Sequence, residues 1–469
     1  MNKAFLFAIA FLAGAAATNL LAAPIDTQPA VSGASDSDTH PPEVADAIHL
    51  FEAGDPQAAY KLLEKAAAKY PQFAPPRVML ANLYFSDNQK APGLEQLELA
   101  AQQYPDDPEP HLIFGDIAMQ ERRISDAEVQ YAAAEPLLKS FAGDAGRKAK
   151  LVAQQKLGLA AVMKARKQWP AAEKFLRQLI QQQPNNAAAH QRLAEALFVQ
   201  SKMDDARAEL QAALKADAAL PPLSMMLAAL YREAGDRDAT QKSLKRALAE
   251  APADIRPRLA LGHWLFELGD IDGAAEQFLD AARIDPKSVE ARFWCGVVAR
   301  FQKQYVKAEH LLEALVEQYP SNAPARNQLA LTLADENAPA KLSRAFDLAT
   351  YNAERGPKNP EAIATLGWIC YLQHKPDDAR EYLGAVAGQG TVSRDTAYWL
   401  ARLQFDLGKR DEAQQLLEQA LSGRGPFAYR EVAERLAAQI RTKSKSSGGS
   451  AEPPSTGPKK SGATESPSK

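Results

Sequence analysis

The stretch GDIDGAAEQFLDAARIDP, residues 269–286, decides the fold because its pattern returns along the whole chain. Ala274, Phe278 and Ala281 follow one another at steps of four and three, which places them on one face of a helix. Pro286 ends that helix, because proline cannot continue the hydrogen-bond ladder. A similar order of residues occurs in GDPQAAYKLLEKAAAKYP at 54–71 and in GKRDEAQQLLEQALSGRG at 408–425.

A period of 34 residues relates these copies. Of the ten intervals between successive unit starts, eight are 34 residues long, and the other two are 45 and 37 residues long. A period that holds along the chain with only two insertions predicts an internal repeat. The units start at His40, Ala74, Pro108, Ala153, Ala187, Pro221, Ile255, Val289, Ala323, Pro360 and Arg394.

Each unit contains two amphipathic runs that predict a pair of helices. The first run carries a leucine followed by a small residue, as at Leu261 and Gly262, and the small residue allows close approach of the neighbouring helix. A turn follows, often with a glycine such as Gly269, which tolerates a positive φ angle. The second run repeats the alanine, large apolar residue and alanine of the opening stretch. Helix-forming residues dominate from about 40 to 440, and the alternation typical of strands is nearly absent.

This pattern resembles the tetratricopeptide repeat, which has a Leu-Gly pair, an Ala-x3-Phe step and a closing proline. The resemblance covers residues 40–427 and implies an all-α, right-handed superhelical solenoid of about eleven antiparallel helix pairs. Repeats 1–3 occupy 40–141, an insertion occupies 142–152, and repeats 4–11 occupy 153–427. We expect the insertion to lengthen two helices around a glycine-containing joint. The last amphipathic run, 426–440, is predicted to be a C-terminal capping helix.

The two ends of the chain differ from the repeats. Residues 1–23 have the order of a secretory signal, with Lys3, an apolar run from Ala4 to Ala17 and small residues before an expected cleavage after Ala22. This predicts an exported protein of the bacterial envelope, periplasmic or extracellular, and an uncleaved anchor helix is the alternative. No cysteine lies near the cleavage site, so a lipoprotein is not expected. A linker at 24–39 and a low-complexity tail at 441–469 are predicted to be disordered.

Composition and motifs argue against several function classes. The net charge of −3 and the absence of a basic run in the repeats disfavour nucleic acid as a partner. The seven histidines are scattered, so neither a metal nor another cofactor is expected, and no motif of an enzyme is found. Cys295 and Cys370 are predicted to be free buried thiols, because two helix pairs separate them. The basic tail is predicted to solubilise the chain, with a peripheral envelope contact as the alternative.

The family resemblance also implies which side chains face the concave groove. In the C-terminal half these positions are rich in aromatic residues and arginine, the types enriched at binding hot spots. We expect them to bind an extended peptide or a helix of a partner protein, although some of the rings belong to the framework. Of the Lys and Asn pairs with which relatives clamp a terminal carboxylate, only Asn82 is present. The candidate binding residues are Leu259, His263, Phe266, Phe293, Arg300, Phe301, Trp368, Tyr371, Tyr398, Arg402 and Phe405.

The sequence therefore predicts a non-catalytic scaffold or adaptor for envelope or secretion-related assembly, with a protein or peptide partner in its groove. Two alternatives remain open. One is a periplasmic chaperone that holds apolar segments, and the other is an assembly factor that binds a glycan or exopolysaccharide.

Overall fold

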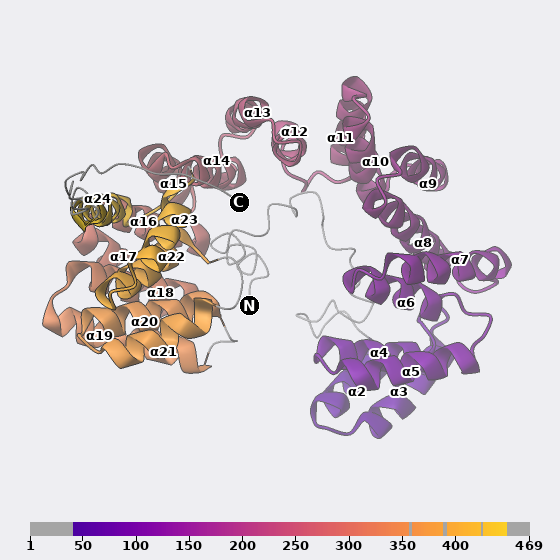
Figure 1. Cartoon of the computed structure of the whole chain (residues 1–469). Coiled ribbons are helices and arrows are strands. Elements are labelled where there is room, and N and C mark those ends of the chain that lie inside the picture. Colours follow the sequence, from indigo (N-terminus) through magenta and orange to yellow (C-terminus); the bar gives the residue numbers. More distant parts are fainter. Residues whose placement is uncertain (1–40, 356–358, 388–391, 424, 448–469) are drawn as a thin grey trace, which may run out of the picture. The chain divides into compact units, whose positions relative to one another are not determined.

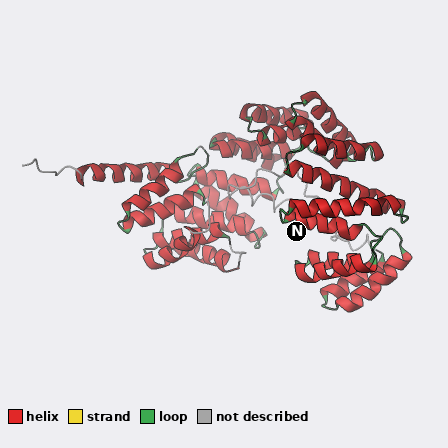
Figure 2. Cartoon of the chain, turned by 45° about the vertical axis from the view of Figure 1, so that its right-hand side comes forward, coloured by secondary structure: helices red, strands yellow, loops and turns green. Residues whose placement is uncertain are grey.

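The computed structural model describes residues 41–355, 359–387, 392–423 and 425–447, with side chains as far as Arg441. The predicted signal peptide (1–23), the predicted linker (24–39) and the end of the predicted tail (448–469) lie outside these residues. All regular structure in the described part of the chain is helical (Figure 1, Figure 2). None of these helices is both long and apolar enough to span a bilayer.

The described helices belong to two compact units, which divide between Pro257 and Arg258. The N-terminal unit contains α2 (Pro42–Glu52), α3 (Pro56–Lys69), α4 (Pro76–Ser86), α5 (Lys90–Gln103), α6 (Glu109–Gln120), α7 (Ile124–Ser140), α8 (Ala145–Ala165), α9 (Trp169–Gln182), α10 (Ala187–Val199), α11 (Met203–Ala216), α12 (Leu223–Glu233) and α13 (Arg237–Glu250). The C-terminal unit contains most of α14 (Ile255–Leu268), then α15 (Ile271–Ile284), α16 (Val289–Phe301), α17 (Tyr305–Gln318), α18 (Ala323–Glu336), α19 (Pro339–Arg355), α20 (Pro360–Leu372), α21 (Pro376–Ala387), α22 (Arg394–Asp406), α23 (Arg410–Leu421) and α24 (Arg430–Ser447).

Consecutive helices pack in pairs, α2 with α3, α4 with α5, and so on to α22 with α23. The predicted all-α fold of about eleven helix pairs is therefore confirmed. Six of the predicted unit starts coincide with the first residue of a helix, for example Val289 of α16. The largest departure is α8, which begins at Ala145 rather than near Ala153, because the insertion extends it.

The two helices of a pair meet at residues that are sixteen positions apart in the sequence, and this sixteen-residue register is constant. The small residue of the first helix lies against the large apolar residue sixteen positions later, as Gly262 lies against Phe278. A Cβ atom added at Gly262 would stand 2.7 Å from Cε1 of that ring. Gly115 and Tyr131, Gly296 and Leu312, and Gly367 and Leu383 repeat the arrangement with closest approaches of 2.7 to 2.8 Å. The repeated pattern thus encodes the closest contact within each helix pair.

A left-handed residue lies in the turn of every helix pair. Gly54, Gly235, Gly269 and Gly408 have φ angles between 77° and 85°, as the sequence pattern predicted for them. In the other seven turns a residue with a side chain takes the same conformation at some conformational cost. These residues are Asn88, Arg122, Lys167, Ser201, Lys303, Asn337 and His374, with φ angles between 51° and 63°.

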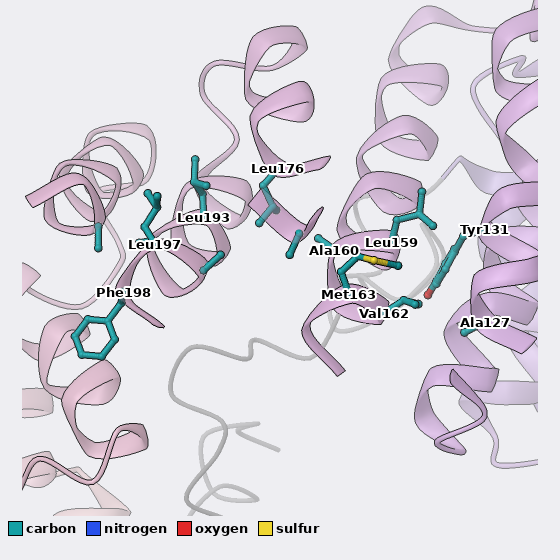
Figure 3. Close-up of a cluster of buried hydrophobic side chains, with 14 of the residues drawn as sticks. Ala127, Tyr131, Leu159, Ala160, Val162, Met163, Leu176, Leu193, Leu197 and Phe198 are labelled. Atoms are coloured by element: carbon teal, nitrogen blue, oxygen red, sulfur yellow. The ribbon is translucent and has the colours of Figure 1, made fainter. Parts of the chain in front are cut away.

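The core of the N-terminal unit continues from pair to pair (Figure 3). Tyr131 is fully buried on α7, and its ring touches both Gly115 of α6 and Gly158 of α8. At the insertion, Arg147 forms ion pairs with Asp107 at 2.7 Å and with Glu109 at 2.6 Å. These contacts tie the start of α8 to the start of α6, and the residues on both sides of the insertion belong to one compact unit.

The C-terminal helix differs from the predicted 426–440. α24 begins at Arg430, because residues 425–427 run outside any helix, and it continues to Ser447, into the predicted tail. Arg and Lys are good helix formers, which explains why the helix extends beyond the last apolar residue. An ion pair of 2.8 Å between Lys303 and Glu431 holds the start of α24 beside the end of α16 (Figure 1).

Candidate functional site in the C-terminal unit

Seven of the eleven predicted groove residues are buried, with exposed fractions between 2% and 9%. These seven residues therefore belong to the framework and are not exposed to a partner, contrary to their prediction as binding residues. The physical reason is that rings of neighbouring first helices pack on one another. For example, the rings of His263 and Phe266 lie edge-on to Trp294, with centroids 4.7 and 5.2 Å away. The seven residues are Leu259, His263, Phe266, Phe293, Arg300, Trp368 and Tyr398.

The other four predicted residues, Phe301, Tyr371, Arg402 and Phe405, are partly exposed. Three of them gather at the ends of α20 and α22. Arg402 Nε donates a hydrogen bond to Tyr371 Oη at 2.9 Å, and its guanidinium lies 5.9 Å from the centroid of the Phe405 ring. Tyr371 Oη donates in turn to the carboxylate of Asp406. The structure therefore brings Tyr371, Arg402 and Phe405 together, whereas Phe301 lies two helix pairs away on α16.

An open cleft of about 820 Å³ lies beside this group, at the edge where the turns of three successive helix pairs meet. Its apolar wall comprises Pro339, Leu342, Leu372, Pro376, Leu403 and Leu407. Its polar rim comprises Asn337, Tyr371, Gln373, His374, Lys375 and Asp406. An apolar floor with a few polar groups at the rim is the usual make-up of a site that binds an apolar side chain and orients it.

A part of the predicted groove is covered by the chain itself. Residues 425–429, which we call the return segment, connect α23 to α24 and cross from α22 to the turn after α14. Arg394 Nη1 donates to the carbonyl oxygen of Gly425 at 3.3 Å, and the backbone N–H of Ala428 donates to Asp395 Oδ1 at 3.1 Å. At the other side, a Cβ atom on Gly269 would be only 3.6 Å from the backbone of Gly425.

Tyr429 anchors the return segment between four helices. Its hydroxyl donates to Asp335 Oδ1 of α18 at 2.5 Å and accepts from Arg300 Nη2 of α16 at 3.2 Å. Arg300 Nε also donates to Asp335 Oδ2 at 2.7 Å. The Tyr429 ring stacks on Tyr398 of α22, with centroids 5.4 Å apart, and lies edge-on to Trp368 of α20 at 5.8 Å. Residues predicted to bind a partner thus bind the chain's own tyrosine.

Burial and neighbouring charges set the protonation of this cluster. Burial, reinforced by the Asp335 carboxylate, raises the pKa of Tyr429 well above its usual value, so the hydroxyl stays protonated and donates. Burial alone would lower the pKa of Arg300, but the charge of Asp335 raises it, so the guanidinium stays charged. Burial raises the pKa of Asp395 to about 7, an effect that Arg300 opposes and Asp335 strengthens.

The sequence pattern did not identify Asp335, Asp395 or Tyr429 as functional residues. Asp395 lies in the first turn of α22, where an acidic residue has an ordinary structural role, and Asp335 lies in the last turn of α18 and belongs to no sequence motif. A signal for Tyr429 was present: Phe427 and Tyr429 are aromatic residues that follow the last repeat and have no place in its register. The amphipathic pattern of 426–440 includes both residues in one predicted helix, so the pattern does not single them out.

A second buried polar cluster lies in the N-terminal unit around Asp116, which is 3% exposed. Its carboxylate accepts hydrogen bonds from Tyr131 Oη at 2.5 Å and from Gln154 Nε2 at 2.6 Å. Burial raises the pKa of Asp116 to about 6. Because both oxygens bond to neighbouring helices of the same unit, we assign the cluster to packing between repeats. Asn82, the one residue that matches the carboxylate clamp of relatives, is 4% exposed.

The two cysteines are free and buried, as predicted. Burial raises the pKa of Cys295 and of Cys370 to about 11. Thiols with such a pKa are protonated at neutral pH and are poor nucleophiles. Within the described residues, no group of three or more His, Cys, Asp or Glu side chains has the geometry to hold a metal ion.

Comparison with known sequences identifies the repeat. Three models of the tetratricopeptide repeat match the chain, and the matched residues together make up more than half of it. The first model matches residues 50–113 and 156–230, the second matches 225–289 and 259–323, and the third matches 395–422. A TPR repeat-containing protein of Pseudomonas aeruginosa is 26% identical over 152 residues. The match covers 32% of this chain and 25% of that protein, so this chain spans about a quarter of the length of the relative.

Solved structures share the helix-pair fold at low similarity. The crystal structure of yeast Tom70 is 14% identical, with a TM-score of 0.37, and the match covers 86% of this chain and 96% of that chain. A thermophilic TPR protein of Thermus thermophilus is 20% identical, with a TM-score of 0.35, over 40% of this chain and 100% of that chain. Because both TM-scores lie below 0.5, neither likeness carries an argument about binding.

Proposed function

The chain belongs to the tetratricopeptide repeat family, whose members generally act as protein–protein interaction scaffolds, and we propose that it is an adaptor that binds a segment of a partner protein in the cleft beside Tyr371. The observation that carries this proposal is the open, apolar cleft of about 820 Å³ in the C-terminal unit. It lies at the edge of the predicted groove and shares one predicted residue, Tyr371, with it.

The chemistry of the cleft favours a peptide segment with a bulky apolar side chain. Leu403 and Leu407 supply apolar surface, and burying a leucine-sized side chain against such a wall stabilises a complex by about 1.5–3 kcal/mol. Tyr371, Arg402 and Asp406 form one hydrogen-bonded group at the rim, which fixes their orientation. Preorganised polar groups around an apolar pocket give specificity at little entropic cost.

The proposed role is non-catalytic. Family membership favours binding over chemistry, and the two buried thiols are protonated near neutral pH. Asp116 and Asp395, two of the carboxylates with a raised pKa, are engaged in hydrogen bonds inside their units. Protein or peptide is the proposed partner class, and nucleic acid is disfavoured by the net charge of −3.

Export to a bacterial envelope is part of the proposal and rests on the signal-like residues 1–23. An envelope or secretion-related assembly would then be the setting of the adaptor. Cell fractionation followed by N-terminal sequencing tests this directly. A periplasmic or extracellular form that begins at Ala23 supports export, whereas a cytoplasmic form that retains Met1 contradicts it.

Cross-linking in native cells, followed by mass spectrometry, tests the adaptor role. The wild type is compared with Leu407→Asp, which places a charge in the cleft, and with Val306→Asp on α17 as the matched control. Val306 is 75% exposed and does not line the cleft. We expect one dominant partner in the wild type and the control, reduced at least tenfold in Leu407→Asp, since a lost leucine contact of about 1.5 kcal/mol or more corresponds to that factor. If Leu407→Asp recovers as much of the partner as the wild type does, the partner does not bind in the cleft.

The alternatives predict different outcomes of the same experiments. A chaperone for apolar segments would give many partners, all weakened by Leu407→Asp. Binding of a glycan by the aromatic residues requires exposed indole faces, yet the four tryptophans of the C-terminal unit are at most 7% exposed: Trp264, Trp294, Trp368 and Trp399. Protection of tryptophan fluorescence by a saccharide would therefore overturn the protein-binding proposal.

A further inference from the structure

The return segment has the character of a bound ligand rather than of a repeat. Residues Gly425 to Phe427 lie outside any helix, and the return segment contacts helices α14, α16, α18, α20 and α22 through side chains and backbone. Tetratricopeptide units contact chiefly their neighbours, because the solenoid is built from local pairs. The return segment instead bonds residues 94 and 129 positions away, from Tyr429 to Asp335 and to Arg300.

The site that holds the return segment is specific for its side chains. Phe427 is 8% exposed and lies against Tyr398, with ring centroids 6.4 Å apart. The Tyr429 hydroxyl both donates to Asp335 and accepts from Arg300, an arrangement that phenylalanine cannot make. Because Arg300 is 2% exposed and its charge is balanced by Asp335, the two side chains form a preformed polar pair at the base of an aromatic site.

Hydrogen bonding around the return segment is incomplete. The indole Nε1 atoms of Trp368 and Trp399 are buried and have no hydrogen-bond acceptor within the described part of the protein. A buried donor without a partner costs about 1–3 kcal/mol. The return segment therefore fills the site without satisfying every group there. It is joined to α23 by a glycine-containing stretch, Ser422 to Gly425, in which Gly425 has a φ angle of 133°.

We propose that this part of the groove is a binding site for a non-helical protein segment that carries an aromatic residue and, two residues later, a tyrosine, and that Phe427 and Tyr429 occupy it in the absence of such a partner. The site lies next to the open cleft, because Trp368 stacks on Tyr371 at 5.1 Å and meets Tyr429 at 5.8 Å. The inference does not depend on occupation of the cleft, and Leu407→Asp leaves it untouched.

The partner that replaces the return segment is a different protein rather than a second copy of this chain. A segment tethered by a few residues has an effective concentration in the millimolar range. An identical segment on a second copy has no additional contacts with which to compete. A different segment that also provides acceptors for the Trp368 and Trp399 indoles would bind more tightly and displace the return segment.

Titration of the full chain with a peptide tests the proposal. The probe is a fluorescent peptide with the sequence of residues 425–435, GPFAYREVAER, followed by anisotropy. We expect the Phe427→Ala/Tyr429→Ala chain to bind it at least tenfold more tightly than the wild type, because the site is no longer filled internally. A peptide with phenylalanine in place of the tyrosine should bind this variant about tenfold more weakly. Equal binding by wild type and variant, or by both peptides, would overturn the proposal.

Hydrogen–deuterium exchange of the wild-type chain gives an independent test that does not depend on the folding of a variant. The Ala428 amide, which donates to Asp395, should exchange well before the amides of α22, because the return segment leaves its site without unfolding of that helix. Exchange of Ala428 only together with α22 would show that the return segment belongs to the core. A concentration-dependent dimer in light scattering, abolished by Tyr429→Phe, would identify a second copy as the occupant and overturn the assignment to a different protein.

Discussion

The sixteen-residue register makes a quantitative prediction at Gly262. In Gly262→Ala the new methyl group would stand 2.7 Å from Cε1 and 2.9 Å from Cδ1 of Phe278. The ring is fully buried and is stacked on Trp294 at 5.3 Å, so it has little room to move. Overpacking of this kind costs about 1–3 kcal/mol, and the better helix propensity of alanine returns at most about 1 kcal/mol. We expect Gly262→Ala to destabilise the C-terminal unit by about 1–2 kcal/mol.

A second substitution separates the ring contact from other effects of the alanine. Six other helix pairs combine alanine with leucine at the same spacing, for example Ala194 with Leu210. Gly262→Ala/Phe278→Leu recreates that combination. Phe278→Leu alone should be destabilising because it leaves a void, but the double variant should be more stable than the sum of the single changes implies. We expect a favourable coupling of about 1 kcal/mol or more.

Gly384→Ala is the matched control for helix propensity. Gly384 lies inside α21, and a Cβ atom there would meet no atom within 4 Å. This control should be stabilised by about 0.5–1 kcal/mol. The assay is urea unfolding followed by tryptophan fluorescence, since Trp294 touches Phe278. If Gly262→Ala is as stable as the wild type, or if the cycle shows no coupling, the register does not explain the glycine.

Other predictions address charge, strain and reactivity. The raised pKa of Asp116 (about 6) favours the folded chain below pH ~4, and that contribution is lost as the pH rises through 6. In urea titrations the stability of Asp116→Asn relative to wild type should therefore increase by about 2.5 kcal/mol between pH 4 and pH 8; an unchanged difference would contradict this. Arg147→Ala should destabilise the N-terminal unit by about 3 kcal/mol in the same assay, because it leaves two largely buried acids without their cation. A loss below about 0.5 kcal/mol would show that the two ion pairs do not stabilise the unit. Lys167→Gly should raise the free energy of unfolding by up to about 1 kcal/mol in thermal unfolding, because glycine adopts the φ angle of 59° without strain. A lower stability of this variant would contradict the presence of strain at Lys167. Cys295 and Cys370 should resist a thiol reagent at pH 8 in the native chain and react in urea; fast native labelling would contradict their burial.

Periodicity was sufficient to predict the framework of the repeats. A helix pair is specified by contacts within about 34 residues, so the spacing of Leu261, Gly262 and Phe278 carries the local geometry. The same locality explains why helices such as α16 and α22 begin at the predicted residues. Turn conformations were predicted only where glycine marks them, because lysine, arginine or serine in a left-handed conformation has no sequence signature.

The candidate site was less predictable because it depends on contacts over long distances in sequence. The family register identified Arg300, Trp368 and Tyr398 as groove residues, but it carries no information on what covers them. Their burial follows from ring packing between first helices and from Tyr429, which is 129 residues from Arg300. A repeat pattern describes neighbours only, so a segment outside the register cannot be placed by it.

Site-specific photo-cross-linking is the most direct test of the central claim, that the C-terminal unit binds a partner protein at its cleft. A photoreactive amino acid at position 407, in the cleft, is compared with the same amino acid at position 306, on α17 outside it. After irradiation of native cells, we predict one discrete adduct at position 407 and none at position 306. No adduct at either position, or the same adducts at both, would contradict the account.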